Sequence, residues 1–194
     1  MKNFRADYLN EIQLSATAAS SAAQSVLNRV SKGELQVVDH AFYSIVSAGG
    51  QTLVKMFDTA RPKEIGLNNI SNGKPASNEM LYLVAVRITA VTLGAAPTAG
   101  SMKVADFASI SGIAGFQNGV ISLKSDKKTI FSQLPLSNFD NAQNQTEDEG
   151  QYFLKIPKWI YPDAEIECEL DFGASALPAN TVVKIELIGM SSQS

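Results

Sequence analysis

The sequence predicts an all-β domain, an antiparallel sandwich or barrel of about eight to ten short strands, preceded by an N-terminal α-helix. From residue 35 onwards, apolar residues recur at every second position or in short runs, which is the pattern of strands. Glycine, proline and asparagine stand between these segments and predict turns. Residues 1–34 show a helical period instead. We therefore expect a helical arm over 1–34 and one β domain over 35–194.

The N-terminal arm carries a heptad pattern of apolar residues that holds for three repeats. Its members are Leu9, Ile12, Ala16, Ala19, Ala23, Val26 and Val30. Asp7 suits the start of a helix and Gly33 the position after its end, which predicts a helix over residues 8–32, about 37 Å long. Small residues dominate the stripe, so this helix buries little apolar area and needs a partner surface. Three arrangements stay open: packing on its own domain, contact with another subunit, or a free arm.

Ten later segments predict strands: residues 35–46, 52–57, 80–92, 102–109, 115–117, 120–124, 129–133, 152–156, 164–172 and 181–190. Asn118-Gly119 between apolar flanks predicts a tight type I′ hairpin, because both residues accept positive φ angles. Asp126, flanked by lysines, marks a second predicted hairpin. The sequence shows no internal repeat, which favours a single β domain.

The composition of the 194 residues excludes several classes of protein. A net charge of −3 argues against general binding of nucleic acids, which needs a concentrated basic surface. An apolar fraction of 45% and a charged fraction of 18% exclude intrinsic disorder. The single cysteine, Cys168, excludes an intrachain disulfide and a zinc site of several thiolates. No apolar stretch reaches about 18 residues, so we expect no membrane span, and residues 1–7 predict no signal peptide.

Residues 164–172 alternate between acidic and apolar side chains. On a strand, Glu165, Glu167, Glu169 and Asp171 share one face, while Ile166, Cys168, Leu170 and Phe172 share the other. Three interpretations of the acidic row stay open: a solvated face partly paired with lysines such as Lys184 or Lys155, a self-assembly contact sensitive to pH or divalent ions, and a cation site. A straight row does not converge on one ion, as calcium requires. Neighbouring acids alone also lack the split environments that a hydrolase needs.

The other candidate residues favour structural roles. His40, the only histidine, lies on a predicted strand without a nucleophile motif such as Gly-x-Ser-x-Gly nearby. Cys168 belongs to the apolar side of its strand, which predicts a core residue and not a reactive thiol. Lys124, Lys127 and Lys128 form at most a weak phosphate patch. The aromatic segment 152–162 fits core packing, an interface or a carbohydrate platform.

Two segments carry a resemblance to a known family. Residues 67–75, LNNISNGKP, lead into the long apolar strand 80–88, and residues 177–181, LPANT, lead into the last strand, 182–190. This layout resembles the jelly-roll capsid proteins of small icosahedral tailless bacteriophages, in which an N-terminal arm precedes an eight-stranded sandwich. The resemblance implies a single antiparallel jelly-roll-like sandwich of about eight strands. It also implies a virion structural protein with no catalytic residues to carry over.

We therefore expect a capsid shell component, made in the host cytoplasm and incorporated in the virion, that self-assembles with copies of itself and with other virion proteins. We expect no enzymatic activity, and we assign no catalytic, cofactor-binding or metal-binding residue. We also expect no sequence-specific contact with nucleic acid, while contact with an internal membrane stays open. Major shell, vertex and accessory roles are equally open. The alternative is a carbohydrate- or protein-binding β-sandwich module that uses Trp159, Tyr161 and Tyr152 on one exposed face.

Overall fold

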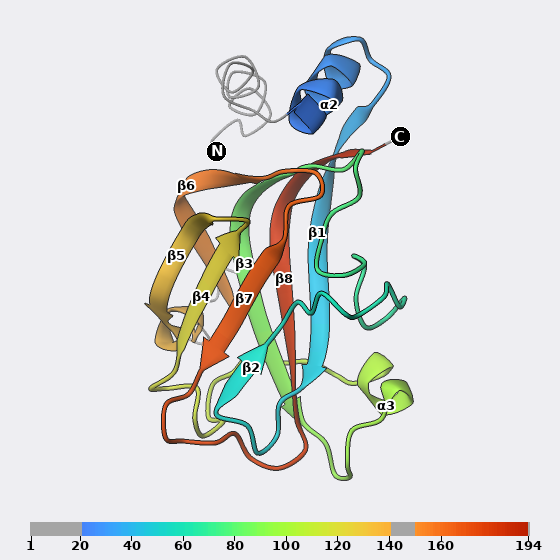
Figure 1. Cartoon of the computed structure of the whole chain (residues 1–194). Helices are drawn as coiled ribbons and strands as arrows, with labels where there is room; N and C mark the ends of the chain where they lie inside the picture. Colours follow the sequence, from blue (N-terminus) through green and yellow to red (C-terminus); the bar gives the residue numbers. More distant parts are fainter. Residues whose placement is uncertain (1–20, 141–149, 194) are drawn as a thin grey trace.

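The computed structural model describes residues 21–140 and 150–193, which form two four-stranded antiparallel sheets packed against each other as two layers (Figure 1). The first sheet has the strand order β1-β8-β3-β6, and the second sheet has the order β2-β7-β4-β5. The strands are β1 Gln36–Ser47, β2 Leu53–Lys55, β3 Leu81–Thr92, β4 Val120–Ser125, β5 Lys128–Pro135, β6 Gln151–Ile160, β7 Ile166–Asp171 and β8 Thr181–Gln193. The prediction of a mostly β, antiparallel domain is confirmed.

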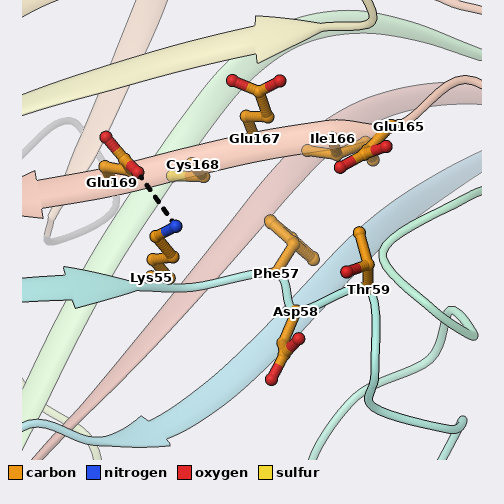
Figure 2. A pocket seen from close by; sticks show the side chains of 9 residues that line it. All are labelled: Lys55, Phe57, Asp58, Thr59, Glu165, Ile166, Glu167, Cys168 and Glu169. Carbon is orange, nitrogen blue, oxygen red and sulfur yellow. Dashed lines mark ion pairs between the residues drawn. The ribbon is translucent and has the colours of Figure 1, made fainter.

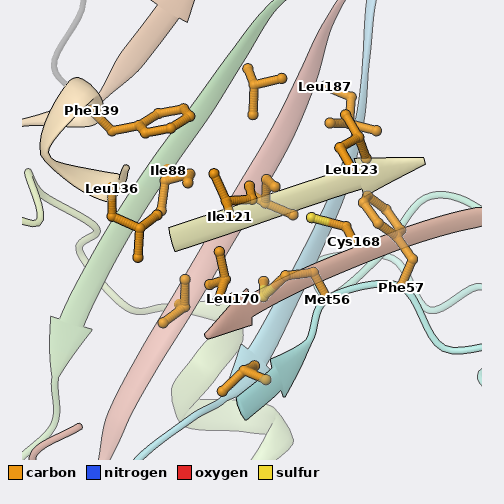
Figure 3. Close-up of a cluster of buried hydrophobic side chains, with 14 of the residues drawn as sticks. Met56, Phe57, Ile88, Ile121, Leu123, Leu136, Phe139, Cys168, Leu170 and Leu187 are labelled. Atoms are coloured by element: carbon orange, nitrogen blue, oxygen red, sulfur yellow. The ribbon is translucent and has the colours of Figure 1, made fainter. Parts of the chain in front are cut away.

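The main core lies between the two sheets, where each strand contributes alternate side chains (Figure 3). Ile88 of β3 and Leu187 of β8 meet Ile121 and Leu123 of β4 there, all fully buried. On β7 the predicted apolar side of the acidic row faces this core, with Cys168 among its members. The alternation read from the sequence therefore assigns the inner face of β7 correctly.

Eight of the ten predicted strands are found, and two predictions are wrong. No strand forms over 102–109. The first two of these residues belong to the short helix α3, Ala99–Lys103. Thr98 caps this helix, because its side-chain oxygen accepts a hydrogen bond from the Ser101 N–H while the Ser101 hydroxyl accepts one from the Thr98 N–H. Residues 115–117 lie in a series of turns in which Gly115 has a φ angle of 98°.

The type I′ hairpin predicted at Asn118-Gly119 is also wrong. Neither residue has a positive φ angle, and the pair leads into β4 without joining two strands. A Cβ atom on Gly119 would lie 2.7 Å from Cδ1 of Leu136, so this glycine permits close packing and does not serve a turn. The hairpin expected around Asp126 is present between β4 and β5, with Asp126 at a φ angle of 51°.

The N-terminal helix is described from Ser21 onwards, as α2, Ser21–Ser31; residues 8–20 of the expected helix, including Leu9, Ile12, Ala16 and Ala19 of its stripe, lie outside the described residues. Gly33 follows α2 with a φ angle of 74°, and its N–H donates to the Val30 carbonyl, as expected for a residue just past a helix end. The helix packs on its own chain at one end of the sandwich (Figure 1). The cluster that joins it to the domain contains Ala23, Val26, Leu27, Leu35 and Met80, with Val30, Trp159 and Tyr161 at its border.

The short 3₁₀ helix η1, Leu136–Phe139, follows β5 and places Leu136 and Phe139 in the main core. None of the described helices is long and apolar enough to span a membrane.

Candidate functional site

The acidic row lies on the outer face of the second sheet, as the alternation predicts, and lysines pair with it. Lys55 lies 3.7 Å from Glu169, Lys124 lies 3.5 Å from Glu167, and Lys74 lies 4.0 Å from Glu165. The prediction of lysine pairing is therefore right in kind but wrong in the named partners. Lys184 belongs to β8 of the other sheet, where its Nζ lies 2.7 Å from Glu186, and Lys155 belongs to β6 of that sheet.

A hollow of about 370 Å³ lies beside this row, between β7 and the segment that follows β2 (Figure 2). It is lined by Lys55, Phe57, Asp58, Thr59, Glu165, Ile166, Glu167, Cys168 and Glu169. The Glu165, Glu167 and Glu169 side chains remain roughly half exposed, at 41%, 50% and 45%. Across residues 21–140 and 150–193, no group of three or more His, Cys, Asp or Glu side chains is placed to hold a metal ion.

Cys168 is a core residue, as predicted. Only 1% of its surface is exposed, and burial together with the nearby Glu169 carboxylate raises the pKa of its thiol far above the usual range. A thiol held neutral in this way is a poor nucleophile.

His40 lies on β1 on the same side of the strand as the buried Phe42. Its Nε2 lies 3.3 Å from Oε1 of Glu79, and its ring meets the Phe42 ring edge-on with a centroid distance of 5.4 Å. These contacts tie β1 to the segment just before β3, which is a structural role. A second hollow of about 430 Å³ is lined by this part of β1, with Ala41, Val84 and Ile188 among its residues.

The aromatic residues of the 152–162 segment do not share one face. Tyr152 packs toward the core, 5.6 Å from the Phe139 ring centroid. Trp159 lies on the opposite face of β6, 4.7 Å from the Tyr82 ring centroid. Tyr152 stands opposite the core residue Val86 and Trp159 stands opposite Tyr82, which packs on the other side of β3. The single exposed platform of the carbohydrate-binding alternative is therefore not formed by these three residues.

The three lysines of the weak phosphate patch also diverge. Lys124 pairs with Glu167, whereas Lys128 places its Nζ 5.1 Å from the ring centroid of Tyr161. Lys127 lies exposed in the β4–β5 turn.

One lateral edge of the sandwich, formed by β1 and β2, is covered by residues 56–80. Asn69 accepts a hydrogen bond from the Tyr43 N–H and donates one to the Ala41 carbonyl, at 2.8 and 2.7 Å. Arg61 donates to another β1 carbonyl at 2.9 Å. Backbone groups along β1 that would otherwise be available to a neighbouring strand are therefore occupied within the chain.

The opposite edge, formed by β5 and β6 (Figure 1), is different. In the part of the chain that the structure describes, β5 pairs only with β4, and β6 pairs only with β3. Phe153 and Ile156 of β6 are 48% and 68% exposed. Five apolar side chains here are only partly buried against the core: Ile130, Phe131, Leu134, Tyr152 and Leu154. We call this surface, with its lysines, the β5–β6 edge.

Sequence reasoning did not single out the β5–β6 edge. The strand predicted at 152–156 extends in the structure to Ile160, through Pro157. A proline inside a strand pattern, flanked by lysines, is the signal that could have identified an edge strand here.

Comparison with known proteins assigns no relatives: no protein-family model matches the chain, and no curated protein matches its sequence.

Proposed function

We propose that this protein is a virion structural protein, a capsid shell component of a bacteriophage, with a single jelly-roll domain that self-assembles through contacts between copies. It acts by burying surface and performs no catalysis. Its partners are other copies of the chain and other virion proteins, and its location is the virion. The observation that carries this proposal is the order of the strands.

The strand order supports a jelly roll because the pairing is nested. β1 lies beside β8, β2 beside β7, β3 beside β6, and β4 beside β5. This is the order obtained when a long antiparallel hairpin is rolled up so that its strands divide between two sheets. Eight-stranded jelly rolls of this kind are typical of viral capsid and lectin domains.

Two surface features favour the shell over the lectin-like alternative. The aromatic residues proposed for a sugar platform lie on different faces of β6, as described above. In contrast, the β5–β6 edge presents apolar side chains at a sheet border, where contact with another chain would bury them. An apolar edge that the described residues leave uncovered suits a subunit better than an isolated binding module.

The N-terminal helix fits the same role. Its described part, α2, is attached to the domain through the cluster around Leu27 and Met80. This anchors the start of the domain at one end of the sandwich.

Electron microscopy of the purified full chain tests the proposal, together with native mass spectrometry over a hundredfold range of concentration. We expect closed particles or discrete oligomers that grow with concentration. A strict monomer at every concentration contradicts the proposal. A monomer that binds sugars on a glycan array, with quenching of Trp159 fluorescence, supports the alternative.

A further inference from the structure

We propose that the β5–β6 edge of one copy docks on the acidic face of β7 of a second copy, in a head-to-tail contact. The acidic face is the row along β7 together with Asp58: Asp58, Glu165, Glu167, Glu169 and Asp171. This inference rests on the proposed function, because it names the two surfaces through which the subunits meet.

The β5–β6 edge has the apolar content of a contact surface. Ile156 is 68% exposed and Phe153 is 48% exposed, and both belong to the same edge strand. On β5, Ile130 and Phe131 are only partly buried against the core. Apolar side chains exposed at a sheet border favour association with another chain.

The charges of the β5–β6 edge determine which surface it can meet. β5 and β6 contain Lys128, Lys155 and Lys158 and no acidic residue, and the adjoining turn holds Lys127 beside Asp126, so lysines still predominate. No ion pair within residues 21–140 and 150–193 involves any of these four lysines. Two such edges placed against each other would bring like charges together, which is destabilising. A symmetric edge-to-edge dimer is therefore disfavoured, and an acidic surface is required.

The acidic face has the complementary charge and shape. Its five carboxylates exceed the three lysines that pair with them, Lys55, Lys74 and Lys124, by two negative charges. Those pairs are loose, at 3.5–4.0 Å, and their carboxylates stay roughly half exposed. The 370 Å³ hollow beside them is lined mainly by polar and charged groups, so it suits a lysine ammonium group from the neighbouring copy.

The two surfaces occupy different parts of the molecule. β7 lies between β2 and β4 in the second sheet, whereas β6 lies at the outer border of the first sheet and β5 at the border of the second (Figure 1). One copy can therefore offer its edge to one neighbour and its acidic face to another. A contact between unlike surfaces repeats around a ring when its rotation closes, and such rings are the units from which a shell is built.

Reciprocal charge reversal tests the contact. The edge variant carries Lys155→Glu and Lys158→Glu, and the face variant carries Glu167→Lys and Glu169→Lys. The control variant, Lys32→Glu with Lys63→Glu, changes the net charge as much as the edge variant does, at two exposed lysines that belong to neither surface as defined above. Association is measured by native mass spectrometry and light scattering, and circular dichroism with thermal melting verifies that each variant folds.

We expect each reversed variant alone to weaken self-association at least about tenfold, because the edge variant has no net charge left on its edge lysine positions and the face variant has a positive face opposite its positive edge. Mixing the edge and face variants should restore a one-to-one complex, since the unchanged acidic face of the edge variant can meet the unchanged basic edge of the face variant. The control should assemble as wild type does. Wild-type assembly by the edge variant alone, or a mixture that stays dissociated, overturns the inference while particles of the wild-type protein leave the proposed function standing. A wild type that never associates overturns both.

The apolar part of the contact has its own pair of variants. Ile156→Ser removes an exposed apolar side chain from the β5–β6 edge, and Ile65→Ser removes one that is 83% exposed on the segment covering β1. Both positions are exposed, so neither change should impair folding. We expect Ile156→Ser alone to weaken self-association, and equal assembly by both variants contradicts a contact at this edge.

Discussion

Attachment of the N-terminal helix to the domain can be tested at Leu27. This residue is 5% exposed and lies in the cluster that joins α2 to Leu35 and Met80, with Trp159 at its border. Leu27→Ala still allows the helix backbone to form, because alanine has the highest helix propensity. It removes most of the side chain that packs the helix against the sandwich. The change therefore acts on docking and not on helix formation.

The size of the effect follows from what the side chain buries. Leu27→Ala removes three buried carbon atoms, each contributing about 0.8 kcal/mol, and partial collapse of the remaining cavity brings the expected loss to about 2–4 kcal/mol. A helix of 11 residues is marginal when it is alone, so it has little stability of its own to offset this loss. We therefore expect α2 to detach locally while the two sheets remain folded.

Trp159 is the only tryptophan of the chain and reports on this docking directly. We expect its fluorescence emission to shift to longer wavelength in Leu27→Ala, with little change in the main melting transition. Ser25→Ala is the matched control, because Ser25 is exposed on the same helix and the change favours helix formation. An unshifted Leu27→Ala spectrum, or the same shift in both variants, would refute docking of α2 beside Trp159.

Three further predictions concern single positions. Because burial raises the pKa of the Cys168 thiol, a thiol reagent at pH 8 should label the native protein negligibly and the denatured protein completely, and rapid native labelling would contradict this placement. Gly189→Ala should lower the free energy of unfolding by roughly 1–3 kcal/mol in chemical denaturation, because a Cβ atom there would lie 2.0 Å from a β3 carbonyl oxygen. The hydrogen bond from Lys103 lowers the pKa of Glu64, so the small stabilisation from this pair is present above the unfolded-state pKa and is lost as the pH falls through the folded-state pKa. NMR titration should show Lys103→Ala raising the pKa of Glu64, and an unchanged value would exclude this ion pair in solution.

Much of the fold was predictable because most strands bury one face. Alternation located β7 within two residues at each end, and turn residues separated it from its neighbours. The apolar run at 80–86 lacks this alternation, because both faces of β3 are covered. Leu83 faces the main core, while Tyr82 on the opposite side packs with Trp159. Periodicity identifies such a strand but not its place in a sheet.

The two wrong types of prediction, a strand over 102–109 and a hairpin at Asn118-Gly119, have different causes. The segment 102–109 has the apolar content of a strand, but the capping box of Thr98 and Ser101 starts a helix just before it. Asn118-Gly119 has the composition of a tight turn, yet the glycine is needed for close packing against Leu136. A helix cap therefore determines the conformation before 102–109, and a tertiary contact determines it at Asn118-Gly119. Composition alone distinguishes neither helix from strand at the first place nor turn from close packing at the second.

The acidic row and the β5–β6 edge also differ in how far the sequence alone predicts them. The acidic row follows from alternation alone, because all its members lie on one strand. Its lysine partners come from β2, from β4 and from the turn before β3, so their identity requires the strand order. The β5–β6 edge requires that order as well: Pro157 between lysines marks β6 as an edge strand, but only the strand order shows that β5 borders the other sheet on the same side.

Lysines on edge strands have a second established use, because they prevent edge-to-edge association in proteins that remain monomeric. The two uses differ in what accompanies the lysines. An edge that is only protected by charge does not need exposed apolar side chains, yet Phe153 and Ile156 stand beside Lys155 on β6. The other lateral edge is covered by a long segment whose side chains bond to the β1 backbone. Residues 21–140 and 150–193 cover one lateral edge in part and leave the apolar, basic edge uncovered, which fits the proposed subunit if a neighbour covers its second edge.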